Sequence, residues 1–208
     1  MIASEEQARA FIRDGWGASA CSVCEQLVEA LREENDRQNL VSRGSLEYVW
    51  TRHIADSAQL LLHAPSGCRS WIDIGTGAGF PGLVIAMLRP DLAVALVEPR
   101  HKRAAWLDAM RGSMGLVNCE VLQVQAERVE RDPFDVISAR AVAGLPELLA
   151  MMRRLDHRGS CGIFPKGRLA AEELAALPSS IADAYLFHVK HSLTAQDARI
   201  IVCRHAED

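Results

Sequence analysis

The segment that decides the fold is Trp71–Gly82, which reads Trp-Ile-Asp-Ile-Gly-Thr-Gly-Ala-Gly-Phe-Pro-Gly. An apolar run that ends in closely spaced glycines and leads into a helical pattern is typical of a strand, a tight loop and a helix at the carboxyl edge of a parallel sheet. Glycines allow the backbone to approach a ligand closely. The segment therefore predicts a ligand site at the end of the first strand.

Two ligand-binding patterns fit these glycines. The spacing Gly77-x-Gly79-x-x-Gly82 matches the dinucleotide fingerprint, in which a pyrophosphate lies at the helix N-terminus. The run from Asp73 to Gly79, an acid followed by three alternating glycines, matches the loop of S-adenosylmethionine enzymes. Asp73 favours the second pattern, because a carboxylate there suits the cationic amino and sulfonium groups of that cofactor. The glycine pattern alone does not decide between them.

Acidic residues follow the next two expected strands. Glu98 ends the strand Ala93–Val97, where a carboxylate can accept hydrogen bonds from both ribose hydroxyls of either cofactor. Ala126 and Glu127 follow the third strand, where an acid and adjacent backbone amides can read an adenine edge. From these positions the predicted cofactor-binding residues are Asp73, Gly75, Gly77, Gly79, Glu98, Ala126 and Glu127.

Short apolar strands alternate with helical segments from Ser70 onward, which predicts an α/β fold with a parallel sheet. The last two strands are separated by only nine residues, too few for a crossover helix, so they are expected to pair antiparallel. Five parallel strands and a hairpin form the seven-stranded, Rossmann-like sheet of class I methyltransferases. The expected strands are Trp71–Ile74, Ala93–Val97, Glu120–Val124, Asp135–Ser138, Ser160–Phe164, Tyr185–Val189 and Arg199–Cys203.

The first 66 residues show helical periodicity and precede the alternating strands and helices. Ser4 and Gln7 make a capping box, and Leu46–Leu62 carries an apolar stripe at helical spacing. The turn Ala64–Gly67 separates this region from the alternating pattern. We therefore expect an N-terminal helical extension over 1–66 and one compact domain over 67–208.

The composition is that of an ordinary globular protein. The chain has 208 residues, of which 49% are hydrophobic and 24% charged, which excludes a disordered or collagen-like chain. Its formal net charge of −4 excludes a general attraction to nucleic acid, so any such binding requires a local patch. No apolar run reaches the roughly 18 residues of a membrane span, and the first residues lack the pattern of a signal peptide. We expect a cytoplasmic monomer without membrane contact, and the scattered cysteines indicate no metal site.

Several motifs in order resemble one known family, the bacterial 16S ribosomal RNA guanine-N7 methyltransferases, also called the glucose-inhibited division protein B family. The resemblance extends from about Asn39 to Gly167. It implies the class I fold, S-adenosylmethionine as cofactor, and a guanine of 16S ribosomal RNA or the 30S subunit as substrate. It places cofactor contacts at Gly75, Phe80, Ala126, Glu127 and Arg140, with Glu98 as the ribose ligand. The motifs are Asn39-Leu40, Arg52–Ser57, Asp73–Gly82, Glu98–Leu107, Ala139–Ala143 and Pro165–Gly167.

The residues after the fourth strand carry no covalent nucleophile. Carbon-5 methyltransferases need a cysteine there, and exocyclic-amine enzymes need Asn or Asp before Pro-Pro-aromatic, whereas this chain has Ser138–Ala141, Ser-Ala-Arg-Ala. Guanine N7 has a free lone pair and needs neither, so alignment of the reactants is the expected catalytic contribution. Arg140 and Lys166 are the predicted positioning residues. The predicted RNA-binding residues are Arg52, His53, Lys102, Arg103 and Lys166.

Other interpretations remain open at this point. Arg52 and Asp56 are spaced for an exposed helix ion pair, and His53 fits a packed core histidine as well as a site residue. The cluster around Lys102 and Arg103 fits either a solvated helix face or a phosphate-binding patch. An NAD-dependent oxidoreductase is the alternative enzyme, although the sequence shows no acid or base for hydride transfer. A non-catalytic, S-adenosylmethionine-sensing RNA-binding module is the alternative without chemistry.

Overall fold

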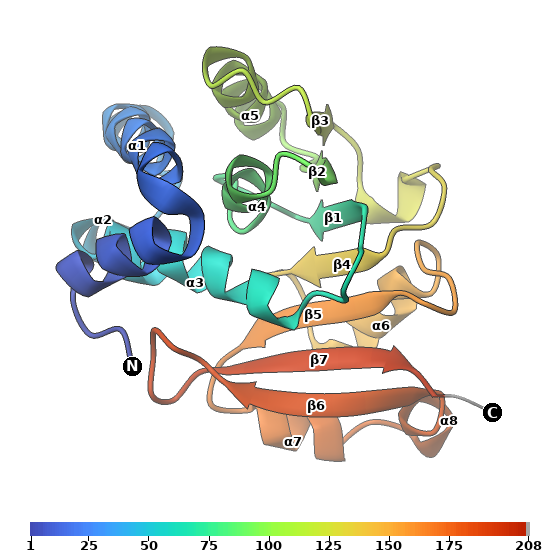
Figure 1. Ribbon diagram of the computed structural model, residues 1–208. Coiled ribbons are helices and arrows are strands. Elements are labelled where there is room, and N and C mark those ends of the chain that lie inside the picture. Colours follow the sequence, from blue (N-terminus) through green and yellow to red (C-terminus); the bar gives the residue numbers. More distant parts are fainter. Residues whose placement is uncertain (207–208) are drawn as a thin grey trace.

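The computed structural model describes residues 1–206 and contains a seven-stranded sheet in the order β3-β2-β1-β4-β5-β7-β6 (Figure 1). The first five strands are parallel, and β7 pairs antiparallel with both β5 and β6. This is the predicted topology, including the terminal hairpin. The strands are β1 (Ser70–Ile74), β2 (Ala93–Val97), β3 (Cys119–Leu122), β4 (Val136–Ala139), β5 (Cys161–Lys166), β6 (Tyr185–His191) and β7 (Arg199–His205).

Helices cover both faces of the sheet (Figure 1). One face carries α4 and α5 together with the N-terminal helices, and the other carries α6 to α8. A strand covered on both faces is typically apolar at nearly every position, as β2 is, because neither face meets water. The first strand, β1, departs from this pattern at Ser70 and at the fully buried Asp73. These helices are α4 (Gly82–Leu88), α5 (His101–Ser113), α6 (Leu145–Met152), α7 (Ala170–Ala175) and α8 (Ser179–Ala182).

The N-terminal region is helical, but its divisions differ from the prediction. Helix α1 (Glu5–Gln38) is continuous except for a kink at Gly17, and Ser4 caps it by accepting the Gln7 N–H at 3.1 Å. The single helix expected over Leu46–Leu62 is instead a series of short turns of different pitch. They are α2 (Arg43–Glu47), the π-helix η1 (Trp50–Ala55), α3 (Asp56–Ala58) and the 3₁₀-helix η2 (Gln59–His63).

The strand order reverses between β1 and β4. From β1 the chain winds outward to β2 and β3, and from β4 it winds the other way to β5. In a sheet of this kind the connections leave a crevice at the carboxyl ends of the two central strands, where ligands bind. Within residues 1–206, no helix has the length and apolar character needed to cross a membrane.

Candidate functional site

The loop after β1 requires its glycines. Gly75, Gly77 and Gly79 all have left-handed backbone, with φ of +64°, +62° and +104°. A Cβ on Gly75 would lie 2.7 Å from Cγ2 of Val142, and one on Gly79 would overlap Leu83. Conformation and space together therefore exclude larger residues, and the loop backbone lies close against its surroundings.

Asp73 stabilises this loop through buried hydrogen bonds. Its carboxylate is fully buried, accepting hydrogen bonds from the Gly82 N–H at 2.9 Å and the Ser138 hydroxyl at 2.8 Å. Burial raises its pKa to about 6, although these hydrogen bonds favour the ionised form. The structure thus differs from the expectation that Asp73 faces a cationic cofactor group, because both oxygens are directed into the protein.

A cavity of about 560 Å³ lies beside the glycine loop. Gly75 forms part of its wall, and Glu98, Ala126 and Glu127 approach from β2 and the 3₁₀-helix η3 (Ala126–Arg128). The Glu98 carboxylate, which is 3% exposed, accepts the Gly77 N–H at 3.1 Å and a second backbone N–H at the start of α5. Glu98 is therefore fixed at the cavity wall by the same loop that its ligand would contact.

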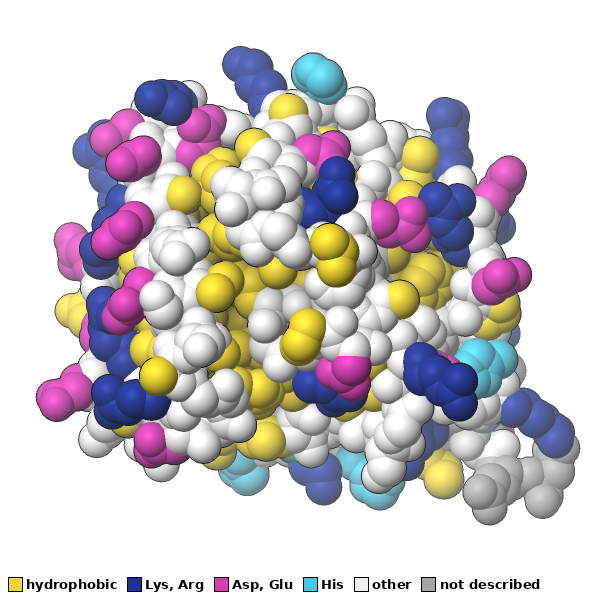
Figure 2. Space-filling view, turned by 45° about the horizontal axis from the view of Figure 1, so that its top comes forward, with side chains coloured by type: hydrophobic (Ala, Val, Ile, Leu, Met, Phe, Trp, Pro, Cys, Tyr) yellow, Lys and Arg dark blue, Asp and Glu magenta, His cyan; other side chains and the backbone are white. Residues whose placement is uncertain are grey.

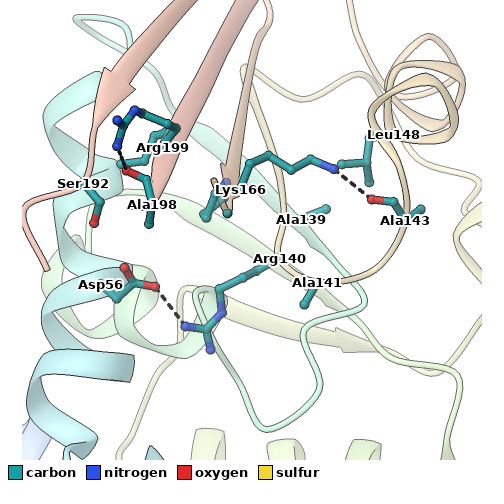
Figure 3. Close-up of a pocket in the computed structure, with 13 residues that line it drawn as sticks. Asp56, Ala139, Arg140, Ala141, Ala143, Leu148, Lys166, Ser192, Ala198 and Arg199 are labelled. Carbon is teal, nitrogen blue, oxygen red and sulfur yellow. Dashed lines mark hydrogen bonds and ion pairs between the residues drawn. The ribbon is translucent and has the colours of Figure 1, made fainter. Parts of the chain in front are cut away.

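A second cavity, of about 270 Å³, lies at the ends of β4 and β5. It is lined by Arg140, Lys166 and Asp56 among others, and Ala141 borders both cavities. In Figure 3 the Arg140 guanidinium points toward Asp56, whereas the Lys166 ammonium points the other way, toward the Ala143 carbonyl. The two cavities are thus adjacent, and the loop after β4 separates them.

Two of the three cationic side chains that line the second cavity are paired with carboxylates, and the third, Arg199, donates to the carbonyls of Gln196 and Ala198. Arg140 Nη1 lies 3.1 Å from Asp56 Oδ2, and Lys166 Nζ lies 2.7 Å from Glu173 Oε2. Lys166 also donates to the Ala143 carbonyl at 3.0 Å. These carboxylates offset part of the repulsion among the cations that line one small cavity.

The imidazole of His53 packs between Arg140 and the glycine loop. His53 stacks on Phe80 with ring centroids 4.8 Å apart, and its Nδ1 lies 3.2 Å from Arg140 Nη2. Burial lowers the pKa of His53 to about 3, with smaller contributions from Arg140 and Arg52. A neutral imidazole accepts from the guanidinium through Nδ1. The structure therefore assigns His53 to the packed interpretation, as a support for Arg140.

Asp56 pairs with Arg140, so the structure does not contain the Arg52–Asp56 helix ion pair that the sequence left open. Arg52 is exposed and contributes its backbone carbonyl, which accepts from Arg140 Nη1 at 3.2 Å. Sequence reasoning missed this link because Asp56 and Arg140 are 84 positions apart. Only the placement of the N-terminal turns against the end of β4 brings the two residues together.

The predicted cofactor residues occupy three different places. Gly75, Glu98, Ala126 and Glu127 line the larger cavity, as the prediction requires. Asp73, Gly77, Gly79 and Phe80 shape or support the glycine loop without lining that cavity, and Arg140 lines the smaller one.

The predicted basic patch on α5 is divided by the structure. Arg103 lines the larger cavity, and its Nη1 lies 3.4 Å from the position of a Cβ on Gly77. Lys102 faces a separate hollow beside Glu34 and Arg37 at the end of α1. The two neighbours therefore do not form a single surface for phosphates, and Arg103 is a candidate cofactor residue that sequence reasoning assigned to RNA.

Charged side chains of both signs are interspersed around the face shown in Figure 2, with hydrophobic side chains exposed between them. This distribution agrees with the small net charge and indicates no single basic face in that view. Among the residues that the structure describes, no three or more His, Cys, Asp or Glu side chains are grouped to hold a metal ion.

Comparison with known proteins gives similarities in sequence and in structure. The family model described as rRNA small subunit methyltransferase G matches residues 20–202. The ribosomal RNA small subunit methyltransferase G of Erythrobacter litoralis is 48% identical over 98% of both chains. The protein of that name from Novosphingobium aromaticivorans is 43% identical over 98% of this chain and 89% of its own.

Solved structures with much lower identity share the fold. A ribosomal protein L11 methylase from Lactobacillus delbrueckii aligns with a TM-score of 0.60 at 13% identity, covering 73% of this chain and 78% of its own. A mutant of MtNAS in complex with S-adenosylmethionine aligns with a TM-score of 0.57 at 14% identity, covering 96% and 79%. These likenesses confirm the predicted class I architecture.

Proposed function

Since the chain belongs to the rRNA small subunit methyltransferase G family, we propose that it transfers a methyl group from S-adenosylmethionine to N7 of a guanine in 16S ribosomal RNA. The observation that carries the proposal is the pair of adjacent cavities at the point where the strand order reverses. The larger cavity suits the cofactor and the smaller one suits the acceptor base, with Ala141 at their boundary.

The backbone and polar groups of the larger cavity support S-adenosylmethionine as its ligand. Its glycine loop brings backbone to the wall at Gly75, where a Cβ would collide with Val142. Glu98 retains unused acceptor capacity on both oxygens for ribose hydroxyls, because each accepts only one hydrogen bond from the protein. Ala126 and Glu127 lie across the cavity, where they can contact the adenine.

Asp73 argues against the dinucleotide alternative. A pyrophosphate at the N-terminus of α4 needs the free N–H groups of that turn, and the Gly82 N–H is already bound by the Asp73 carboxylate. The same negative side chain would repel a phosphate. The buried acid therefore supports the S-adenosylmethionine pattern although it contacts the loop and not the cofactor.

The chemistry requires alignment of the two reactants. When bound, S-adenosylmethionine supplies an electrophilic methyl group on its sulfonium. Guanine N7 carries an unprotonated lone pair, so no side chain has to remove a proton, and correct placement contributes up to about 7 to 11 kcal/mol of the barrier. Arg140 and Lys166 line the acceptor cavity, where they hold guanine O6 or a flanking phosphate. The methylated guanine becomes cationic, which disfavours a cation stacked on its ring.

We infer that the enzyme works as a monomer in the cytoplasm, on 16S ribosomal RNA or the assembled 30S subunit. RNA contacts are proposed at Arg52, next to the acceptor cavity, and at Lys102, farther along the surface. His53 and Arg103 contribute indirectly, since one supports Arg140 and the other lines the cofactor cavity.

Calorimetry on the purified protein tests the cofactor site. We expect S-adenosylmethionine to bind and NAD not to bind, and Glu98→Ala to weaken binding by about 1.5 to 3 kcal/mol, the value of hydrogen bonds to a charged group. Glu120→Ala is the matched control, because Glu120 is exposed on β3 and its carboxylate pairs with Arg131. Unchanged affinity in a folded Glu98→Ala protein would exclude the ribose assignment. Transfer of labelled methyl to RNA then separates an enzyme from a binding module.

A further inference from the structure

Asp56 is the meeting point of three segments that are distant in sequence. Its Oδ2 accepts from Arg140, at the end of β4, at 3.1 Å. Its Oδ1 accepts from Gln59 Nε2 at 2.8 Å and from the Thr194 hydroxyl at 2.7 Å. Both carboxylate oxygens therefore accept hydrogen bonds. Oδ2 binds a residue that lines the acceptor cavity, and Oδ1 binds two residues that do not line it.

The outer partners of Asp56 are themselves fixed. Gln59 is 1% exposed, and its Oε1 accepts the Leu193 N–H at 2.7 Å. Thr194 belongs to the loop between β6 and β7, where Ser192 donates to or accepts from its hydroxyl at 3.0 Å. Neither Gln59 nor Thr194 lines either cavity. The hydrogen bonds thus connect the hairpin loop, through Asp56, to the guanidinium of Arg140.

This arrangement restricts Arg140 to one orientation. The guanidinium is also held by the Arg52 carbonyl and by His53 Nδ1, so its acceptors all come from the turns between Trp50 and Ala58. A guanidinium presents its N–H donors in a fixed planar geometry, so its orientation matters as well as its charge. An arginine side chain without partners samples many rotamers and does not keep one orientation.

We propose that Asp56, held by Gln59 and Thr194, is a positioning residue that fixes Arg140 for the acceptor nucleotide. The inference extends the proposed function of the second cavity and rests on it. In this proposal the hairpin loop and the N-terminal turns affect methyl transfer through the orientation of Arg140. They do not contact the reacting atoms themselves. Arg140 touches the acceptor, whereas Asp56 acts through Arg140.

A double-mutant cycle measures this coupling. We expect Asp56→Asn to lower the single-turnover rate of methyl transfer about tenfold at saturating cofactor and RNA, and to change it less than about twofold when Arg140 is already Ala. Arg140→Lys should not restore the rate, because an ammonium lacks the fork. Asp108→Asn is the matched control: Asp108 pairs with Arg111 on the surface of α5, and the change should leave the rate unaltered. Equal losses from Asp56→Asn in both backgrounds would overturn the proposal.

Thr194→Val provides a second route that spares the ion pair. It removes one hydrogen bond to Asp56 while keeping the side-chain shape, and we expect about a threefold lower transfer rate with unchanged cofactor affinity. The Arg140 side-chain N–H signals in ¹H–¹⁵N spectra of the cofactor-free protein, assigned by their loss in Arg140→Ala, should be sharp in the parent and broadened in Thr194→Val and Asp56→Asn. Unaltered signals and rate in Thr194→Val would refute the positioning role.

The two readouts separate the inference from the proposed function. If the parent protein binds S-adenosylmethionine but methylates no RNA, the proposed function fails, and the spectra alone decide whether Asp56 fixes Arg140. If the parent methylates RNA and the cycle is additive, the proposed function stands and the positioning role is wrong.

Discussion

Arg103 and Lys102 are neighbours on α5 with different surroundings. Arg103 lies against the glycine loop in the larger cavity, while Lys102 faces the end of α1. We therefore predict that Arg103→Ala weakens S-adenosylmethionine binding by about 1 kcal/mol or more, and that Lys102→Ala leaves it unchanged. Calorimetry on both variants checks this difference.

Measurements of RNA affinity at several salt concentrations test the role of Lys102. Because we propose that Lys102 contacts a phosphate of the RNA, Lys102→Ala should flatten the salt dependence of RNA affinity, and an unaltered salt slope would contradict that contact. Equal cofactor affinities for the two variants would contradict the division of the basic cluster.

The residue types of the site were readable from sequence, whereas their directions were not. Asp73 lies near the carboxyl end of β1 and Glu98 follows β2, so their place at the sheet edge was predictable. Successive side chains of a strand point to opposite faces of the sheet, so a shift of one position reverses the direction of a carboxylate. The conformation of the following loop then determines which backbone N–H groups that carboxylate binds. Asp73 consequently holds Gly82 inside the fold, while Glu98 lines the cavity.

The glycine loop is the element whose conformation most depends on residue identity. Gly75→Ala places a methyl group 2.7 Å from Val142 at a φ of +64°. Gly67→Ala, in the turn before β1, has a φ of +77° with no atom near the added group, and so is the matched control. Both changes should cost about 1 to 2 kcal/mol of stability through backbone strain, and Gly75→Ala should cost more through the contact.

Cofactor binding separates these two glycine variants. We expect Gly75→Ala to lose measurable S-adenosylmethionine binding and Gly67→Ala to retain it. Thermal unfolding and calorimetry give the two quantities. Retained binding in Gly75→Ala would show that the loop tolerates a side chain beside the cofactor.

The helical turns between Arg43 and His63 show what periodicity misses. The apolar stripe over Leu46–Leu62 correctly predicted a buried helical segment, but not its change of pitch from π to 3₁₀. Within this segment His53 stacks on Phe80 and Asp56 pairs with Arg140. Sequence spacing assumes one pitch, so it left an Arg52–Asp56 pair open where the structure pairs Asp56 with Arg140.

The whole molecule combines the helical extension and the sheet around a shared interior. Buried residues of α1 and of the turns that follow belong to the same hydrophobic cluster as α4 and β1. The sequence correctly predicted five parallel strands and a terminal antiparallel hairpin, because alternating strands and helices permit few topologies. The division at residue 66, into an extension and a domain over 67–208, stays a prediction.

Stability should depend on pH through His53. Its pKa is about 3 in the folded protein and about 6.5 when unfolded, so the unfolded chain binds the additional proton between these values. His53 therefore favours unfolding increasingly as the pH falls below about 6.5, with no contribution above pH 7. The raised pKa of Asp73 acts in the opposite direction, since the folded state gains a proton below pH 6.

Comparison with His53→Phe isolates this contribution, because Asp73 is present in both proteins. The difference in free energy of unfolding, parent minus variant, should be constant above pH 7 and should decrease steadily toward pH 4. Urea denaturation across that range measures it. A difference that does not change with pH would contradict a neutral, buried His53.

The central claim is methylation of guanine N7 in 16S ribosomal RNA, and mass spectrometry of the methylated nucleoside tests it most directly. The purified protein is incubated with 30S subunits from a strain that lacks this enzyme and with S-adenosylmethionine carrying a deuterated methyl group. The account predicts labelled 7-methylguanosine in 16S ribosomal RNA, formed roughly tenfold to several-hundredfold more slowly with Arg140→Ala under the same conditions. Label on a different atom or base, or no label from a folded protein that binds S-adenosylmethionine, would contradict it.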